Sequence, residues 1–278
     1  MSLGGSDLDR FRRDGFVVLE GFVDPSTCAA LRARMGELLA DFDPEGVRTV
    51  FASRDQRHAQ DDWFLDSGDK IRFFFEPDAF DEHGGLRQTK DLSVNKAGHA
   101  PHDLDPVFAA FSRDRRFAAV ASAIEFAQPL LLQSMYIFKQ PRIGGEVVCH
   151  QDSTFLHTEP PSCAGFWLAL QDADENNGCM WAEPGGHRRP LHQRFVREGR
   201  RTRMETVHPA PLPVDGLVPL AAREGSLILL HGQLPHRSGP NLSDRSRHAY
   251  MLHLIDGACR YSPDNWLHRG PDMPLRGF

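Results

Sequence analysis

Cysteine is scarce in this sequence and is widely spaced. Five cysteines occur in 278 residues, and no two of them form a Cys-x-x-Cys pair. The pattern therefore indicates neither a zinc knuckle nor a disulfide framework. A reducing, cytoplasmic location fits such cysteine usage. The five are Cys28, Cys149, Cys163, Cys179 and Cys259.

Long apolar runs and an excess of positive charge are also missing. No stretch approaches the ~20 apolar residues of a membrane span, and residues 1–6 lack the charged-then-apolar pattern of a signal peptide. The formal net charge is −6, which argues against a protein that binds nucleic-acid phosphates through a basic face. We therefore expect no membrane segment, no nucleic-acid partner and, by default, a monomer.

The composition that remains is that of a globular domain, with 40% hydrophobic and 25% charged residues. In the N-terminal part, Asp24 and Pro25 are suited to the first positions of a helix, and Leu31, Met35 and Leu39 follow at helical spacing. Similar patterns predict helices over 7–14, from 25 to about 39 and over 104–126, strands over 16–19 and 71–76, and a loop over 41–69.

From residue 130 onward, short β-type segments alternate with turns rich in Gly, Pro, Asn and Asp. This pattern is typical of a sandwich or jelly roll. We predict a mainly β protein in which helices support a jelly roll, forming one domain over 1–278. Its helix-rich part covers about 1–128 and its jelly-roll core about 129–258. The predicted strands are 131–139, 146–150, 166–171, 178–182, 205–208, 226–231 and 247–255.

Two His-x-acid pairs could begin a metal site. With 14 His and 38 acidic residues in 278 positions, chance alone gives 14 × 38 / 278, or about 1.9 such pairs. His150 ends an apolar run after a Gly-Gly turn, so alternation along a strand places His150 and Asp152 on one face. His157 and Glu159 lie in a loop-like segment, which is a poorer platform. The context favours His150 and Asp152.

A facial metal triad needs a third ligand from a distant strand, and His231 and His236 are the candidates. Arg247 opens the next predicted strand, and in an antiparallel hairpin it would return close to His236. A buried Arg needs an anion, and a carboxylate suits its two-donor fork. This combination favours His236, whereas the plainer alternative pairs Arg247 with Asp244 or another surface acid.

The sequence resembles the phytanoyl-CoA dioxygenase family from about residue 8 to about residue 267. The resemblance implies a double-stranded β-helix (jelly-roll) core and hydroxylation of a small molecule. It also implies the use of iron(II), O2 and 2-oxoglutarate, which is decarboxylated to succinate and CO2. The stretches that carry the resemblance are 14–22, 67–76, 133–141, 144–152, 183–187 and 241–247.

Carried over residue by residue, the resemblance implies that His150, Asp152 and His236 are the iron ligands and catalytic residues. Arg247 and Ser238 then hold the far carboxylate of 2-oxoglutarate. Because Asp152 is present where halogenase-like relatives have a small residue, hydroxylation is favoured. The remaining residues implied to contact the cosubstrate or line its pocket are Lys96, Met135, Gln151 and Trp167.

Several alternatives stay open. Cys149 adjoins a ligand but is expected to face the other side of its strand, as a small core residue. Seven arginines between residues 188 and 203 form either a solvated insertion or an anion patch for a substrate such as an acyl-CoA or another anionic metabolite. A non-catalytic sensor that binds metal and 2-oxoglutarate, and a cupin-type metalloenzyme of other chemistry, are the competing functions.

Overall fold

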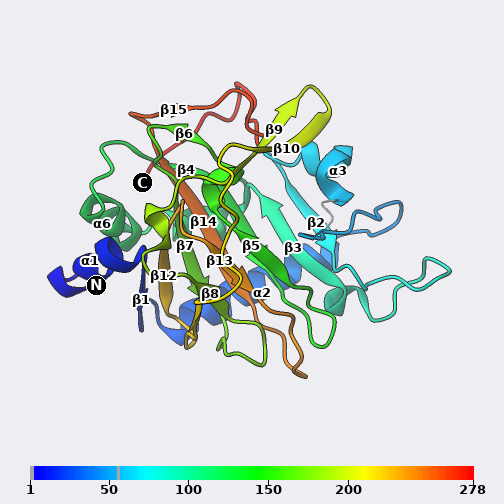
Figure 1. The fold of residues 1–278 in the computed structure, drawn as a ribbon. Coiled ribbons are helices and arrows are strands. Elements are labelled where there is room, and N and C mark those ends of the chain that lie inside the picture. The colour runs from blue at the N-terminus through cyan, green and yellow to red at the C-terminus, as the bar shows by residue number, and fades with distance from the viewer. Residues whose placement is uncertain (1–2, 55–56) are drawn as a thin grey trace.

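The computed structural model describes residues 3–54 and 57–278, and its centre is two antiparallel sheets that face each other (Figure 1). The larger sheet has seven strands in the order β1 (Phe16–Leu19), β12 (Leu227–His231), β7 (Ala164–Ala169), β14 (Ala249–Asp256), β4 (Pro129–Ile137), β3 (Val94–His99) and β2 (Ile71–Phe75). The smaller has four in the order β11 (Val218–Leu220), β8 (Met180–Ala182), β13 (His236–Ser238) and β5 (Val147–His150). The predicted mainly β, jelly-roll class is confirmed.

The central strands of the larger sheet are apolar on both faces because both faces are covered. On β12, Leu229 belongs to the outer core, whereas Ile228 and Leu230 belong to the core between the sheets. On β7, Phe166 likewise belongs to the outer core and Trp167 to the core between the sheets. The two-residue period of a strand produces this division, and it gives the inner face side chains that can line a cavity.

Helices cover the outer face of the larger sheet. The helix α2 begins at Pro25, after Asp24 accepts a hydrogen bond from the backbone N–H of Thr27 at 2.8 Å. In Figure 1, α1 and α6 lie together at one end of the sheets and α3 lies at the other. The helices are α1 (Gly5–Asp14), α2 (Pro25–Asp41), α3 (Asp62–Leu65), α4 (Pro101–Leu104), α5 (Pro106–Ser112) and α6 (Arg115–Ala123), with short 3-10 turns η1 (Arg57–Gln60), η2 (Lys90–Leu92), η3 (Asp152–Thr154) and η4 (Gly186–Arg188).

Some predicted elements were wrong in detail. The single helix over 104–126 is three helices, because Asp105 and Asp114 each cap a new one. The predicted strand over 205–208 is the end of a hairpin, β9 (Gln193–Glu198) with β10 (Arg201–Thr206). The loop over 41–69 holds η1 and α3, and β3 was missed altogether. A further missed pair is β6 (Thr158–Glu159) with β15 (Arg260–Tyr261).

The hairpin predicted to bring Arg247 beside His236 is also wrong. The strand β13, which begins at His236, pairs with β5 and β8, whereas β14, just after Arg247, pairs with β4 and β7. His236 therefore lies in the smaller sheet, Arg247 lies just before a strand of the larger sheet, and both line the same cavity. The N-terminal strands β1, β2 and β3 also join the larger sheet, so the first 128 residues share one sheet with the predicted core.

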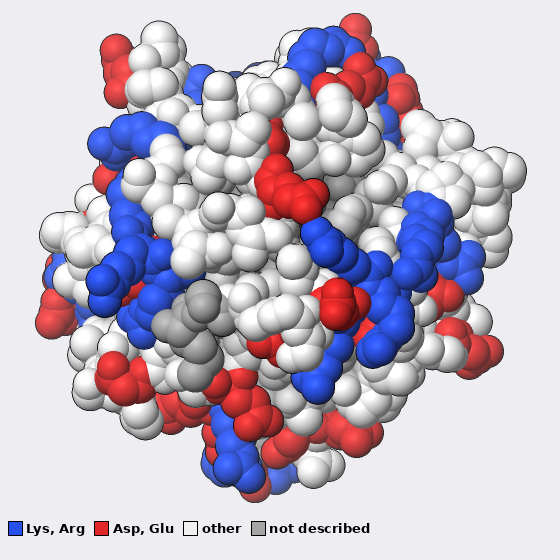
Figure 2. All heavy atoms as spheres, turned by 90° about the vertical axis from the view of Figure 1, so that its left-hand side faces the viewer, with Lys and Arg blue, Asp and Glu red and all other residues white. Residues whose placement is uncertain are grey.

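The surface carries both signs of charge. On the face shown in Figure 2, acidic and basic side chains are interspersed among neutral ones. Within residues 3–54 and 57–278, no helix has the length and apolar character to cross a membrane.

Replacing Phe117 by Ala should destabilise the fold. Phe117 on α6 is 1% exposed, and its ring centroid lies 5.1 Å from that of Phe22 and 5.9 Å from that of Phe166 on β7. Removing this ring should lower the free energy of unfolding by about 3–5 kcal/mol, measured by urea denaturation. Val107→Ala on the exposed side of α5 is the matched control, with an expected change within about 0.5 kcal/mol. Equal effects of both changes would contradict this packing.

Candidate metal and cosubstrate site

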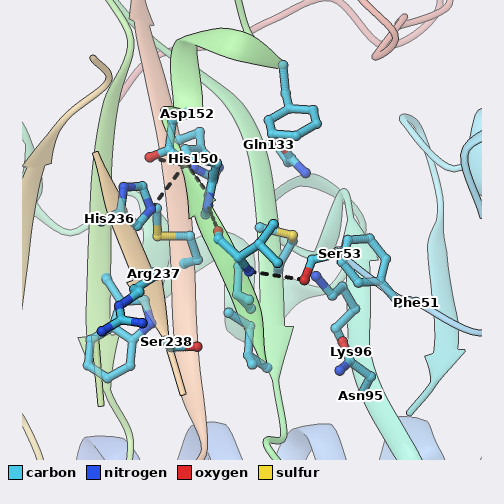
Figure 3. A pocket seen from close by; sticks show the side chains of 18 of the residues that line it. Phe51, Ser53, Asn95, Lys96, Gln133, His150, Asp152, His236, Arg237 and Ser238 are labelled. Atoms are coloured by element: carbon cyan, nitrogen blue, oxygen red, sulfur yellow. Dashed lines mark hydrogen bonds and ion pairs between the residues drawn. The ribbon is translucent and has the colours of Figure 1, made fainter. Parts of the chain in front are cut away.

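A cavity of about 170 Å³ lies between the two sheets. Its walls come from both, since Met135, Trp167 and Met251 belong to the larger sheet and Val148 and Met180 to the smaller. Among the described residues, only one set of three His, Cys, Asp or Glu side chains is placed to hold a metal ion, and it lies in this cavity: His150, Asp152 and His236 (Figure 3).

The two histidines are brought together by strand pairing. His236 on β13 is the direct cross-strand partner of His150 at the end of β5, and their ring centroids are 4.3 Å apart. Gln151 remains extended, with φ −116° and ψ 132°, so Asp152 follows on the same side as His150. The Asp152 Oδ1 atom lies 3.5 Å from the Nε2 of His150 and 3.7 Å from the Nε2 of His236.

Backbone carbonyls set the tautomers of both histidines. The Nδ1 of His150 lies 2.9 Å from the oxygen of Val148, and the Nδ1 of His236 lies 2.9 Å from the oxygen of Leu234. A carbonyl only accepts, so each Nδ1 carries the proton and each Nε2 keeps a free lone pair directed at Asp152. Burial lowers the pKa of His236 to about 4, which keeps this imidazole neutral near pH 7.

Asp152 is buried, and its carboxylate is ionised. Burial raises its pKa, but the neighbouring His253 and His236 lower it more, and the net pKa lies well below its usual value. Two imidazoles and one carboxylate on one side of an ion leave other positions open, which is the donor set of mononuclear iron(II) oxygenases. The residues present therefore fit an iron(II) ion.

Arg247 supplies a buried cation with unused donors at the other end of the cavity. Its side chain is 2% exposed, and Nη2 donates to the oxygen of Gly178 at 3.1 Å. Its Nε and Nη1 have no hydrogen-bond partner among the described residues. The suggested surface pairing with Asp244 is wrong, because Asp244 pairs with Arg142. A buried guanidinium with free donors fits a carboxylate ligand.

Lys139 is a residue of this cavity that the sequence reasoning missed. It is 1% exposed, and its ammonium donates to Ser238 Oγ at 2.9 Å and to the oxygen of Gly145 at 2.6 Å. Burial and the nearby Arg247 lower the pKa of Lys139, while Glu76 opposes them. The sequence offers one sign of Lys139: it is one of only four lysines, and it stands at the end of an apolar segment predicted to be a strand.

The structure places Lys96, Met135 and Trp167 in the same cavity. The Lys96 ammonium lies 3.2 Å from the centroid of the Phe51 ring, and burial lowers its pKa to about 7. The Trp167 ring lies 5.2 Å from the guanidinium carbon of Arg247. All three side chains line the cavity that the metal ligands and Arg247 also line.

Gln151 does not line the cavity, although it is buried. Its amide nitrogen donates to the oxygen of Gln233 at 2.8 Å, and its amide oxygen accepts from the backbone N–H of His192 at 2.9 Å. These bonds join the turn before η3 to two loops. The side chain is thus placed to fix the position of its neighbours His150 and Asp152.

The competing ligand candidates lie elsewhere. His231 packs beside His187, with ring centroids 5.2 Å apart, and does not line the cavity. Glu159 forms an ion pair with Arg260 on β15, and its Oε1 lies 3.6 Å from the Nε2 of His157. Among the described residues, no third metal-ligating side chain lies beside this pair. Cys149 is half-buried and belongs neither to the cavity lining nor to the set of three side chains that could hold a metal.

Most of the arginines in 188–203 already have partners within the chain. Arg194 pairs with Asp264 at 2.5 Å, and Arg197 donates to the oxygens of Leu65 and Trp266. Arg189, Arg200 and Arg203 pair with acidic side chains, and Arg188 donates to the oxygen of Arg13. The hairpin therefore uses its charges to hold neighbouring segments, which favours the solvated-insertion interpretation over an anion patch.

Aromatic side chains form the other wall, which the sequence reasoning also missed. Phe64 of α3 stacks on Trp266 with ring centroids 4.2 Å apart, and Phe51 and Phe155 line the same side. Phe51 and Phe64 belong to the segment predicted to be a loop. No periodic pattern marks such residues, since they come from short turns far apart in the sequence.

Comparison with known proteins gives consistent results. Residues 11–249 match the family model for phytanoyl-CoA dioxygenase (PhyH). The chain is similar to phytanoyl-CoA dioxygenase 1 of Oryza sativa subsp. japonica, with 47% identity over 277 residues, which is 99% of this chain and 97% of that protein. It is also similar to phytanoyl-CoA dioxygenase domain-containing protein 1 of Bos taurus, with 43% identity over 98% of this chain and 97% of that protein.

Solved structures share the fold at lower identity. EctD from S. alaskensis in its apoform has a TM-score of 0.67 at 21% identity, with 96% of this chain and 82% of that chain covered. The epimerase SnoN in complex with Fe3+, alpha ketoglutarate and nogalamycin RO has a TM-score of 0.66 at 18% identity, with 97% and 90% covered. With a family model over most of the chain and relatives above 40% identity, the chain belongs to the phytanoyl-CoA dioxygenase family.

Proposed function

We propose that this protein is an iron(II)- and 2-oxoglutarate-dependent dioxygenase that hydroxylates a small molecule and converts 2-oxoglutarate to succinate and CO2. The observation that carries the proposal is one cavity that holds both a His-Asp-His ligand set and a buried Arg247 with unused donors. Membership of the phytanoyl-CoA dioxygenase family supports it.

In this proposal, His150, Asp152 and His236 hold iron(II) through two Nε2 atoms and Oδ1. The bound metal and 2-oxoglutarate supply the activation of dioxygen. Arg247 and Ser238 bind the far carboxylate of 2-oxoglutarate, and Lys139 orients the Ser238 hydroxyl. The walls of the cavity exclude water and keep the reacting groups in place.

The proposed substrate side is the aromatic wall. A cavity of about 170 Å³ is close to the ~150 Å³ site that holds a single benzene, and 2-oxoglutarate must share it. We infer that only a compact, largely apolar part of a small molecule reaches the iron, against Phe51, Phe155 and Trp266. The bulk of a larger anionic metabolite, such as the CoA part of an acyl-CoA, then stays outside.

Two other functions use part of the same geometry. A sensor that binds metal and 2-oxoglutarate without turnover needs the same residues, whereas a cupin-type enzyme of other chemistry has no need of the free donors of Arg247. The buried Arg247 therefore favours a protein that binds 2-oxoglutarate, and turnover separates the enzyme from the sensor.

The purified protein should form succinate from 2-oxoglutarate when iron(II) and air are supplied. Asp152→Ala and His236→Ala remove a ligand each and should lower this rate by at least about 100-fold, with His231→Ala as the matched control that retains the rate. Succinate is measured by mass spectrometry and folding by circular dichroism. Binding of 2-oxoglutarate by the wild type without any succinate would instead indicate a sensor.

Arg247→Ala should weaken 2-oxoglutarate binding and leave metal binding nearly unchanged. The loss of a buried charged partner costs about 2–5 kcal/mol, so the KM for 2-oxoglutarate should rise by roughly 30-fold or more. The exposed Arg245, two residues earlier, supplies the control Arg245→Ala with an unchanged KM. A collapse of metal binding in folded Arg247→Ala protein would contradict the assigned role.

The affinity for 2-oxoglutarate should fall as the pH rises above about 7. The pKa of Lys96 is lowered to about 7 by burial, and a bound carboxylate favours its charged form. The Kd for 2-oxoglutarate should therefore rise by up to about tenfold for each unit by which the pH exceeds that pKa. In Lys96→Met the affinity is lower and this part of the pH dependence is lost, as isothermal titration between pH 6 and 9 can show. An identical profile in both proteins would exclude Lys96 from the site.

A further inference from the structure

One oxygen of Asp152 is not needed by the metal site. Its Oδ1 faces the two histidine Nε2 atoms, which leaves Oδ2 turned towards the larger sheet. There the Nε2 of His253, on β14, lies 3.3 Å from Oδ2. Both residues are buried, at 5% and 4% exposure. His253 thus contacts the carboxylate from the side opposite to the ligand set.

The neighbouring strand leaves room for this oxygen. Gly165 on β7 is the direct cross-strand partner of His253. A Cβ atom at Gly165 would lie 3.1 Å from Asp152 Oδ2 and 2.6 Å from the Cε of Met251. Glycine at this point of a central strand therefore keeps open the space that Oδ2 occupies beside His253.

The His253 imidazole makes no hydrogen bond among the described residues. Neither of its ring nitrogens has a hydrogen-bond partner there, and the 3.3 Å contact with Oδ2 is close but is not directed as a hydrogen bond. Two other buried imidazoles are paired, since Nδ1 of His99 lies 2.7 Å from Ser67 Oγ and that of His102 lies 2.7 Å from Ser134 Oγ. A buried polar group without a partner is costly, so the carboxylate oxygen 3.3 Å away points to the role of His253.

We propose that His253 is a positioning residue for the metal ligand Asp152, an inference that rests on the proposed function. The imidazole donates its Nε2–H to Oδ2, and a small rotation of the carboxylate directs this bond. With Oδ2 held in this way, Asp152 binds metal through Oδ1 alone. The position that a two-oxygen carboxylate would occupy then stays open, as a facial triad requires.

Metal binding by two variants tests whether the donor matters. Leu fills the site without a donor in His253→Leu, whereas the amide of His253→Gln places an N–H near the position of the imidazole Nε2. His231→Leu, which removes a half-buried imidazole from β12 away from the cavity, is the matched control. Mn2+ affinity is measured by electron paramagnetic resonance without 2-oxoglutarate, and the Co2+ visible spectrum reports the number of ligands.

We expect His253→Leu to weaken Mn2+ binding by on the order of 10–100-fold and to change the Co2+ spectrum. His253→Gln should remain within a few-fold of the wild type, and His231→Leu should match it. Thermal unfolding of each protein without metal checks that the fold is kept. Equal Mn2+ affinity in His253→Leu and wild type, or equal losses in the Leu and Gln variants, would overturn the proposal.

Failure of this inference is separable from failure of the proposed function. If the wild type forms succinate but His253→Leu binds Mn2+ normally, only the role of His253 is wrong. If the Leu and Gln variants differ as expected while no succinate is formed by the wild type, His253 positions Asp152 and the proposed chemistry is wrong.

Discussion

The site depends on the pairing of β13 with β5. This pairing sets His236 directly opposite His150 and brings ligands 86 residues apart within reach of one ion. Asp152 follows His150 after one extended residue, Gln151, so the end of β5 supplies both. The larger sheet then closes the site from behind with Trp167, Met251 and His253. A shift of β13 by one residue would turn His236 to the other face of its strand and remove the third ligand.

The buried charge of the cavity is a second constraint, because it limits which cosubstrate the cavity can bind. Three buried basic side chains, Lys96, Lys139 and Arg247, line the cavity together with the exposed Arg237, and Asp152 is the only acid among the described lining residues. Glu76 lies behind the wall and accepts hydrogen bonds from Asn95 and the N–H of Gly145. Cations so far in excess of acids are costly to bury without an anion. A dicarboxylate such as 2-oxoglutarate offsets this excess, which is why the cavity suits such a cosubstrate better than a neutral one.

Sequence predicted the parts of this protein that local pattern determines. Alternation and turn residues predicted the β-rich second half, and strand alternation predicted that His150 and Asp152 share a face. His236, which the structure brings beside them, was favoured by the family resemblance and by a hairpin that the structure does not contain. The strand β3 was missed because its residues, such as Asn95 and Lys96, are polar and become buried only through partners elsewhere in the fold. Lys139 and His253 were missed for the same reason, since only the meeting of the sheets places them at the site. The pairing of β13 was wrongly predicted because closeness in sequence does not decide which sheet a strand joins.

The central claim is that one cavity binds iron(II) and 2-oxoglutarate together through His150, Asp152, His236 and Arg247. The most direct measurement is an anaerobic titration of the iron(II)-loaded protein with 2-oxoglutarate, followed by the visible charge-transfer absorption of the complex. The account predicts a band that saturates at one 2-oxoglutarate per chain and is lost in His236→Ala. The absence of such a band in the wild type, or its persistence in His236→Ala, would contradict it.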